Sequence, residues 1–183
     1  MKKPTREEIL ASVNKGIEDV IDYNLKVLFV GINPGLYTAA VGHHFGRPGN
    51  RFWKAVFEAG ITDKLLHPSQ QKELFKFGYG ITNLVNRATV GASEVTKEEF
   101  IKGGKILLGK IIKYKPRWVA FVGIEAYRKA YGRPSAKVGY QKEKIKGANI
   151  WVLPNPSGLN AHYTPTQLSI LFSKLKKRAD ISK

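Results

Sequence analysis

Four short runs of mostly apolar residues divide the chain, and three of them are followed directly by glycine or proline. The runs cover residues 26–30, 80–85, 117–122 and 150–153. Continuous apolar runs of this length are typical of strands that are buried on both faces of a parallel sheet. We therefore predict four buried strands at these positions.

Helix-start signals occur between and around these runs. Thr5 and Thr96 are each followed by glutamate three residues later, which forms a capping box, and Asn50 is placed to cap another helix. The first signal predicts an N-terminal helix within residues 1–24. Apolar side chains recur at i, i+3, i+4 and i+7 among lysines over residues 164–183, which predicts a basic C-terminal helix.

Helices alternate with the predicted strands along the chain, and two further short helices are expected after Pro68 and around residues 125–131. This alternation predicts an α/β protein with a three-layer α/β/α fold and a short, mainly parallel central sheet. Because no internal repeat or low-complexity segment interrupts the chain, we expect a single domain over residues 1–183. Sites in such folds form in loops at the carboxyl ends of strands, here residues 31–49 and 154–162.

The charge balance favours a polyanionic partner. The 183 residues include 31 Lys and Arg against 14 Asp and Glu, which gives a formal net charge of +17. No apolar run approaches the ~18 residues of a membrane-spanning helix, and the N-terminus has no signal-peptide core. We expect a cytoplasmic protein, associated with the nucleoid in a prokaryote or nuclear in a eukaryote, that binds nucleic acid rather than membrane.

The chain contains no cysteine. Disulfides, thiol catalysis and cysteine-ligated zinc or iron–sulfur clusters are therefore excluded. The adjacent His43 and His44, with His162 further on, lack the HExxH spacing of a zinc site. We expect no metal and no other cofactor, and we interpret these histidines as cavity walls or phosphate donors.

The loop over residues 31–49 is rich in glycine, which suggests phosphate binding. It contains neither the GxxxxGK[ST] nor the GxGxxG spacing that phosphate-binding loops need. Instead, its turn presents Asn33 at the end of the first predicted strand, where Pro34 fixes the backbone and Gly35 allows a close approach. An isolated Asn-Pro-Gly sequence is more often a plain turn, and this alternative stays open.

In the loop over residues 154–162, small polar residues surround one apolar side chain, Leu159. Proteins that kink DNA use such an arrangement, because the apolar side chain enters the base stack while small neighbours let backbone amides approach phosphates. The alternative is that Leu159 packs beneath its own loop.

Together the two loops resemble those of the mismatch-specific uracil/thymine DNA glycosylases, a branch of the uracil-DNA glycosylase superfamily. The matching segments are residues 30–36, 42–45, 48–54, 80–85, 99–104 and 153–159, with Arg87 and Thr89. They occur in the family's order and span residues 26–159. Two long motifs at matching strand ends are far more specific than either motif alone.

The resemblance implies a uracil-DNA glycosylase-like fold and a monofunctional hydrolase of N-glycosidic bonds in base excision repair. Its substrate would be uracil, or thymine or another damaged pyrimidine, mispaired with guanine in duplex DNA. A mismatched base costs less to extrude, which is one physical source of selectivity. The expected partner is therefore double-stranded DNA with G:U or G:T mismatches, bound by a monomer.

The resemblance also implies roles for residues around the flipped base. Asn33 matches the asparagine that holds the attacking water, and because an amide is a far weaker base than a carboxylate, the expected mechanism is dissociative. Phe45 matches the aromatic residue on which the base stacks, its alternative being an ordinary core phenylalanine. Ile32 and Asn83 match further base-binding positions.

Four residues of the second loop match DNA-binding positions: Asn155, Ser157, Gly158 and Leu159. Leu159 matches the residue that enters the duplex behind the extruded base. For Asn155 and Ser157, which match positions that shape the site and contact phosphate, turn capping is the alternative. Backbone amides at 31–35 and 157–159 are candidates to stabilise the negative charge on the leaving base.

Basic residues are concentrated between positions 128 and 147, directly before the fourth predicted strand. We expect this segment to contact the DNA backbone, and we interpret the basic cluster near the C-terminus as a solvated helix face. The main alternative function is a non-catalytic basic α/β protein that binds nucleic acid. A nucleotide- or phosphate-binding enzyme ranks last because its phosphate motif is absent.

Overall fold

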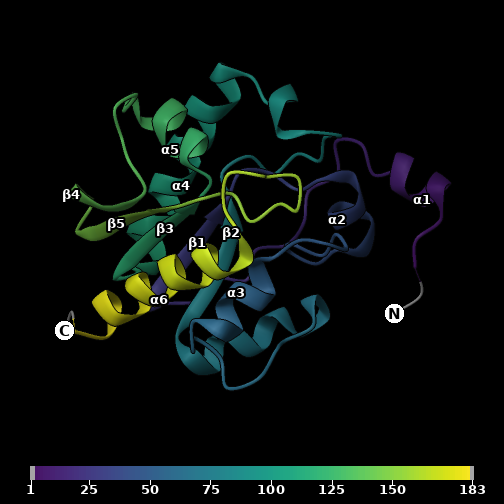
Figure 1. Cartoon of the computed structure of the whole chain (residues 1–183). Helices are drawn as coiled ribbons and strands as arrows, with labels where there is room; N and C mark the ends of the chain where they lie inside the picture. Colours follow the sequence, from purple (N-terminus) through teal and green to yellow (C-terminus); the bar gives the residue numbers. More distant parts are fainter. Residues whose placement is uncertain (1–2, 182–183) are drawn as a thin grey trace.

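A five-stranded sheet forms the middle layer of the structure, a computed structural model that describes residues 3–181 (Figure 1). The strand order is β2 (Tyr79–Asn83), β1 (Val27–Gly31), β3 (Trp118–Val122), β5 (Ala148–Leu153) and β4 (Gly139–Ile145). The first four strands are parallel, and β4 is antiparallel to β5. All four predicted strands are confirmed within two residues. Residues 1, 2, 182 and 183 of the expected domain lie outside the described residues.

Side chains alternate between the two faces of the sheet and create two cores. In β1, Val27 and Phe29 belong to one core, and Leu28 and Val30 belong to the other. The first core is covered by α3 (Phe52–Glu58) and α6 (Pro165–Ile181), the second by α4 (Lys97–Tyr114) and α5 (Ile124–Tyr131) (Figure 1). The predicted three-layer α/β/α fold is confirmed.

The edge strand β4 is absent from the sequence prediction. Its residues are mostly exposed or half-buried, and Lys142 and Lys144 interrupt any apolar run. Lysines on an exposed edge strand discourage pairing with other chains, so such a strand reads as a solvated basic segment. The segment over residues 128–147 therefore contains the end of α5, a turn and β4.

The predicted helix within residues 1–24 is much shorter in the structure. The capping box of Thr5 and Glu8 is present, but α1 covers only Arg6–Leu10. Asn14 adopts a left-handed backbone with φ 63°, which ends the helical turns. Val20 then pairs with Ile81 of β2, so this segment follows the edge of the sheet rather than continuing a helix.

Three short helices complete the fold. The glycine-rich loop after β1 contains α2 (Leu36–Val41), which ends at Gly42 with φ 69°. The helix predicted after Pro68 is the 3₁₀ helix η1 (Pro68–Phe77), and a second 3₁₀ turn, η2 (Ala92–Glu94), precedes α4. Between residues 3 and 181, no helix is both long and apolar enough to cross a membrane.

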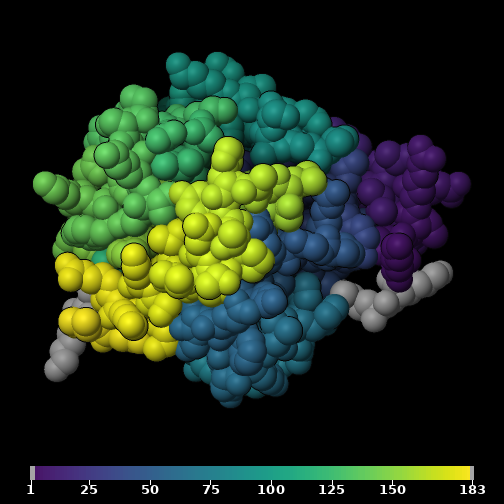
Figure 2. Space-filling model, viewed as in Figure 1, coloured from purple at the N-terminus to yellow at the C-terminus, as the bar shows by residue number. Residues whose placement is uncertain are grey.

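The loops at the carboxyl ends of the parallel strands meet on one side of the molecule. In the space-filling view, the yellow-green loop after β5 lies between the blue residues that precede α3 and the teal residues that follow β2 (Figure 2). Because β1, β2, β3 and β5 are parallel, the chain segments that follow them converge there.

Candidate active site

A cavity of about 690 Å³ opens where these loops converge. The structure brings seven of the eight sequence-predicted site residues to its wall: Ile32, Asn33, Phe45, Asn83, Asn155, Ser157 and Leu159. The eighth, Gly158, lies between two of them in the chain. The cavity is large enough for a pyrimidine nucleotide and has a mixed polar and apolar wall, as small-molecule sites usually have.

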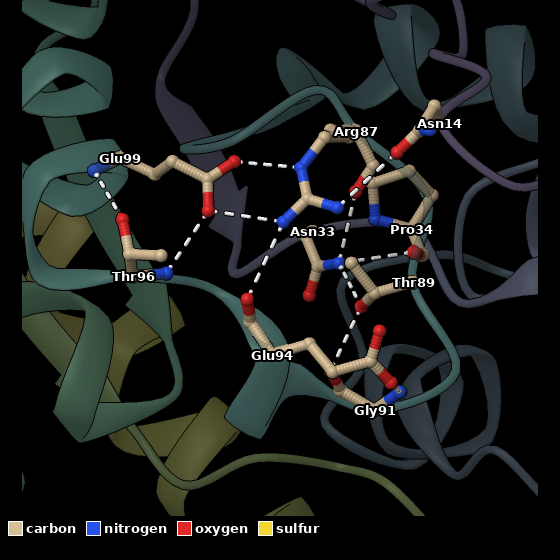
Figure 3. A network of polar contacts seen from close by, with 9 residues as sticks. All are labelled: Asn14, Asn33, Pro34, Arg87, Thr89, Gly91, Glu94, Thr96 and Glu99. Carbon is tan, nitrogen blue, oxygen red and sulfur yellow. Dashed lines mark hydrogen bonds and ion pairs between the residues drawn. The ribbon is translucent and has the colours of Figure 1, made fainter.

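The Asn33 side chain is fixed by three hydrogen bonds that all start from Nδ2 (Figure 3). Nδ2 donates to the Pro34 carbonyl at 3.1 Å, to the Arg87 carbonyl at 3.0 Å and to Thr89 Oγ1 at 2.8 Å. Thr89 Oγ1 in turn donates to the Gly91 carbonyl at 2.8 Å, so it must accept from Asn33.

These acceptors determine which way the Asn33 amide faces. Carbonyl oxygens only accept hydrogen bonds, so the NH₂ group must point toward Pro34 and Arg87, and Oδ1 must point away from them. In residues 3–181 no protein donor to Oδ1 is found, and Figure 3 shows this oxygen clear of the network. Asn33 therefore presents a fixed acceptor at the cavity wall.

An ion pair supports the chain segment that holds Asn33. Arg87 Nε and Nη2 donate to the two carboxylate oxygens of Glu99 at 2.6 and 3.0 Å (Figure 3). Glu99 also accepts from the backbone N–H of Thr96, within the capping box of α4. The hydrogen bonds from Arg87 and from Thr96 lower the pKa of Glu99 to about 2. The network thus ties the acceptors of Asn33 to the start of a long helix.

Phe45 is a cavity residue with an unusual backbone. Its φ of 53° lies in the left-handed region, which a bulky residue adopts at a cost. One face of its ring stacks on Phe52, with ring centroids 4.0 Å apart and planes 15° from parallel. Phe45 lines the cavity with its ring half-buried, and it also packs against the first core.

Asn83 ends β2 and contributes an unpaired amide to the cavity. The residue is 7% exposed, and its Nδ2 has no hydrogen-bond partner among the described residues. A Cβ added to Gly31 would lie 2.5 Å from Asn83 Oδ1, so glycine is required for this approach. A buried amide without a partner is costly unless a ligand supplies one.

The Leu159 loop, residues 154–163, projects its apolar side chain outward. Leu159 is 79% exposed, so the alternative that it packs beneath its own loop is wrong. Asn155 Oδ1 accepts from the N–H of Ser157 at 3.0 Å, and Ser157 Oγ accepts from the N–H of Leu159 at 3.3 Å. In this structure, both polar side chains therefore cap the turn, as the alternative held.

The glycines of two loops allow them to pack closely. A Cβ at Gly158 would lie 2.7 Å from the carbonyl oxygen of Gly49, so a larger residue would push the loops apart.

Two of the backbone amides that were candidates to stabilise the negative charge on the leaving base, those of Ser157 and Leu159, already have acceptors within the turn.

His44 is a buried wall of the cavity rather than a phosphate donor. It is 1% exposed, and its Nε2 donates to the Glu18 carbonyl at 3.0 Å. Burial lowers the pKa of His44 to about 4, so the ring is neutral at neutral pH. Within the described part of the chain, no group of three histidine, aspartate or glutamate side chains could hold a metal ion.

The charge of the cavity wall is mainly positive. Arg47 and Arg128 line it, and the carboxylate among the lining residues, Glu125, is paired with Arg128 Nη1 at 3.1 Å.

Only part of the basic segment over residues 128–147 lies near the cavity. Because β4 is antiparallel to β5, Gly139 lies at the cavity end of the sheet and Ile145 at the opposite end, roughly 20 Å away.

Sequence reasoning missed one arginine of the site and the supporting roles of three other residues. Arg51 donates several hydrogen bonds to the Leu159 loop, and Arg87, Thr89 and Glu99 hold Asn33 only through the network in Figure 3. The sequence did show that Glu99 stands in a capping box and that Arg51 follows a predicted cap residue. It did not show which residues they contact, because these lie far away in sequence.

Two comparisons with known proteins concern the family and the fold of this chain. The model of the uracil DNA glycosylase superfamily matches residues 18–176. The fold is also similar to a solution NMR structure of a Methanosarcina acetivorans protein that is provisionally named a uracil DNA glycosylase. That similarity has a TM-score of 0.54 at 20% sequence identity, and it covers 90% of this chain and 99% of the other.

Proposed function

Because the chain belongs to the uracil DNA glycosylase superfamily, we propose that it is a monofunctional DNA glycosylase that removes uracil mispaired with guanine from duplex DNA. Superfamily membership supports hydrolysis of N-glycosyl bonds in DNA. The choice of the G:U mismatch, with thymine or another damaged pyrimidine as a second substrate, rests on the two loop motifs and on the cavity that they form.

The observation that carries the proposal is the fixed amide of Asn33. Its NH₂ group is held by three acceptors, and its Oδ1 stands at the wall of a nucleotide-sized cavity. An oxygen in that position accepts a hydrogen bond from a water molecule and orients it toward the sugar of an extruded nucleotide.

The chemistry expected from this arrangement is dissociative. An amide oxygen orients water but does not remove its proton efficiently, so the C–N bond breaks before water adds to the sugar cation. The electrons of that bond leave with the base as an anion. After water adds, its proton passes to solvent or to the departing base, and the products are free uracil and an abasic site.

Two residues are suited to hold the extruded base. Phe45 offers a ring that is already stacked on Phe52 from behind, and base–aromatic stacking contributes about 1–3 kcal/mol. The unpaired Nδ2 of Asn83 supplies a buried donor for a pyrimidine carbonyl oxygen. Ile32 provides an apolar part of the same wall.

Leu159 is suited to fill the space that the extruded base leaves. Its exposure at the tip of a turn has no packing explanation, and an apolar side chain of this kind enters a base stack in proteins that kink DNA. The turn is built from Asn155, Ser157 and Gly158, whose small side chains let the DNA backbone approach.

The test compares cleavage of matched oligonucleotide duplexes by excess protein in a single turnover. Duplexes with G:U, G:T, A:U or G:C at one position are incubated, treated with alkali and analysed for strand breaks. We expect breaks at G:U, slower breaks at G:T and none at G:C. Equal cleavage of A:U and G:U would contradict the mismatch preference while leaving the glycosylase activity intact.

A non-catalytic nucleic-acid-binding protein is the second candidate, favoured by the net charge of +17. It predicts binding with a log–log salt slope of about −0.9 per neutralised phosphate, but no strand breaks in any duplex. Absence of breaks at G:U after long incubation would select this candidate over the glycosylase.

A further inference from the structure

Arg51, the residue directly before α3, directs its guanidinium group into the Leu159 loop. Nη1 donates to the Tyr163 carbonyl at 2.6 Å, and Nη2 donates to the carbonyls of Ser157 at 2.6 Å and Asn160 at 2.9 Å. Nε donates to the Pro156 carbonyl at 3.3 Å, and the backbone N–H of Arg51 donates to the same carbonyl at 3.0 Å. One residue thus binds four carbonyl groups of a single loop.

Hydrogen bonds inside the loop join residues that are two to five positions apart, and they include those of Asn155 and Ser157 that cap the turn. Residues 154–163 form no helix or strand, and their largest aliphatic side chain, Leu159, is 79% exposed. Inside the loop, Asn160 Nδ2 donates to the Asn155 carbonyl at 2.8 Å. Fixing a backbone costs conformational entropy at every residue, and the charge-assisted bonds from Arg51 offset part of that cost.

The contact requires an arginine. A guanidinium group has five N–H donors in a rigid plane, so it can bind carbonyls that lie in several directions at once. A lysine ammonium at this position would reach one or two of them. No carboxylate in residues 3–181 forms an ion pair with Arg51, and the hydrogen bonds of its guanidinium group given above all end on backbone carbonyls.

The consequence concerns Leu159. If the turn is free to collapse, its exposed apolar side chain gains by folding back onto the protein and leaving water. Arg51 opposes that collapse because its four acceptors lie on both sides of Leu159 in the chain, at 156, 157, 160 and 163.

We propose that Arg51 is a positioning residue that holds the Leu159 loop in the shape needed for base extrusion. This inference rests on the proposed function, because Leu159 fills the space of an extruded base only if the protein extrudes one. Arg51 acts on the extrusion step, which precedes bond cleavage and limits its observed rate, whereas Asn33 acts on the cleavage step itself.

The first experiment separates these two steps. A duplex carries G opposite 2′-fluorinated deoxyuridine, which resists cleavage, next to 2-aminopurine, whose fluorescence rises when it unstacks. We expect a rise with wild-type protein and with Asn33→Ala, and less than half that rise with Arg51→Ala and Arg51→Lys at saturating protein. Arg6→Lys, an exposed arginine of α1, is the matched control and is expected to behave as wild type.

The second experiment measures coupling to Leu159 through a double-mutant cycle on single-turnover cleavage of G:U duplex. We expect Arg51→Ala to slow cleavage about tenfold, the effect of roughly 1.4 kcal/mol, and to add little when Leu159 is already alanine. Thermal unfolding shows whether each variant is folded. If Arg51→Ala is not folded, Arg51→Lys, which keeps the positive charge, takes its place in the cycle.

Two outcomes would overturn the inference. One is a full fluorescence rise with folded Arg51→Lys and Arg51→Ala. The other is strict additivity of the Arg51 and Leu159 substitutions, which would show that the two residues act independently. Failure of the proposed function has a different signature, since wild-type protein would then release no uracil from any duplex.

Discussion

Asparagine side chains around the cavity have the same chemistry, and their neighbours decide what each can do. Asn33 has its NH₂ group occupied and its oxygen open, whereas Asn155 uses its oxygen to cap a turn. Asn83 has a buried NH₂ group without a partner in the described part of the chain. These differences support the proposal that Asn33 binds water and that Asn83 recognises the base.

At the same scale, Thr89 is expected to fix the Asn33 amide. Thr89→Val keeps the shape of this buried side chain but removes the acceptor of one Asn33 hydrogen bond. We expect single-turnover cleavage of G:U duplex to slow about tenfold, with DNA affinity unchanged, because one bond of this kind contributes about 1 kcal/mol or more.

The matched control for Thr89 is Thr62→Val. Thr62 is also buried, and its hydroxyl donates to the Lys64 carbonyl, but it does not line the cavity. A loss of activity in the Thr62 variant equal to that in the Thr89 variant would show that the effect is a general loss of stability.

At the scale of elements, the site is a product of strand ends and one helix start. Loops after β1, β2 and β5 supply Asn33, Thr89 and Leu159, and the first turn of α4 supplies Glu99. The ion pair of Arg87 with Glu99 connects that helix to the acceptors of Asn33 (Figure 3). Helix α4 therefore supports the candidate active site although none of its residues lines the cavity.

Glu99→Gln tests this connection. The variant keeps a capping side chain but loses the charge that Arg87 binds, so we expect several-fold slower cleavage and a lower melting temperature. Glu98→Gln, one residue earlier on the exposed side of the same turn, is the control. Equal effects of the two substitutions would contradict a specific role for the ion pair.

The elements were predictable from sequence where a single local signal defines them. Continuous apolar runs predicted the four parallel strands, and the capping boxes at Thr5 and Thr96 marked helix starts that the structure contains. Edge strand β4 was not predictable in this way, because its exposed lysines hide the pattern. The short length of α1 was not predictable either, because the segment that follows it pairs with β2 through Val20, which is a tertiary contact.

The composition of the site was predictable, but its orientation was not. The loop motifs marked Asn33, Phe45 and Leu159 as neighbours of one cavity, and the structure places all three there. The direction of the Asn33 amide is set by Arg87 and Thr89, 54 and 56 residues further along the chain. No local pattern carries information about acceptors at that distance.

Positive charge is abundant over the whole protein, but only some of the basic residues lie near the cavity. Arg47 is exposed at the rim of the cavity, whereas Lys144 lies near the far end of β4. We expect Arg47→Ala to reduce the magnitude of the log–log salt slope of DNA binding by about 1 and Lys144→Ala to leave it unchanged. Fluorescence anisotropy across a salt series measures both, and equal slopes for the two variants would contradict this division.

Stability is expected to fall in mildly acidic solution because of His44. Burial lowers its pKa to about 4, while an unfolded histidine has a pKa near 6.5, so the unfolded chain binds more protons between these values. The contribution of His44 to the free energy of unfolding is fully present above pH ~6.5, and it decreases by up to about 3 kcal/mol as the pH falls to ~4.

Urea unfolding at pH 7 and pH 4.5 measures this effect. We expect the free energy of unfolding to depend less on pH in His44→Gln than in wild type, and the exposed His67→Gln to match wild type. The same pH dependence in wild type and His44→Gln would show that His44 does not account for it.

The proposed role of Asn33 is to orient the water that hydrolyses uracil from a G:U pair. Its most direct test is the amount of free uracil released from G:U duplex by excess protein, measured by mass spectrometry over time. Wild type is expected to release one uracil per duplex, and Asn33→Ala to do so at least about 10²-fold more slowly with unchanged DNA affinity. Release of uracil at the same rate by both proteins would contradict the account.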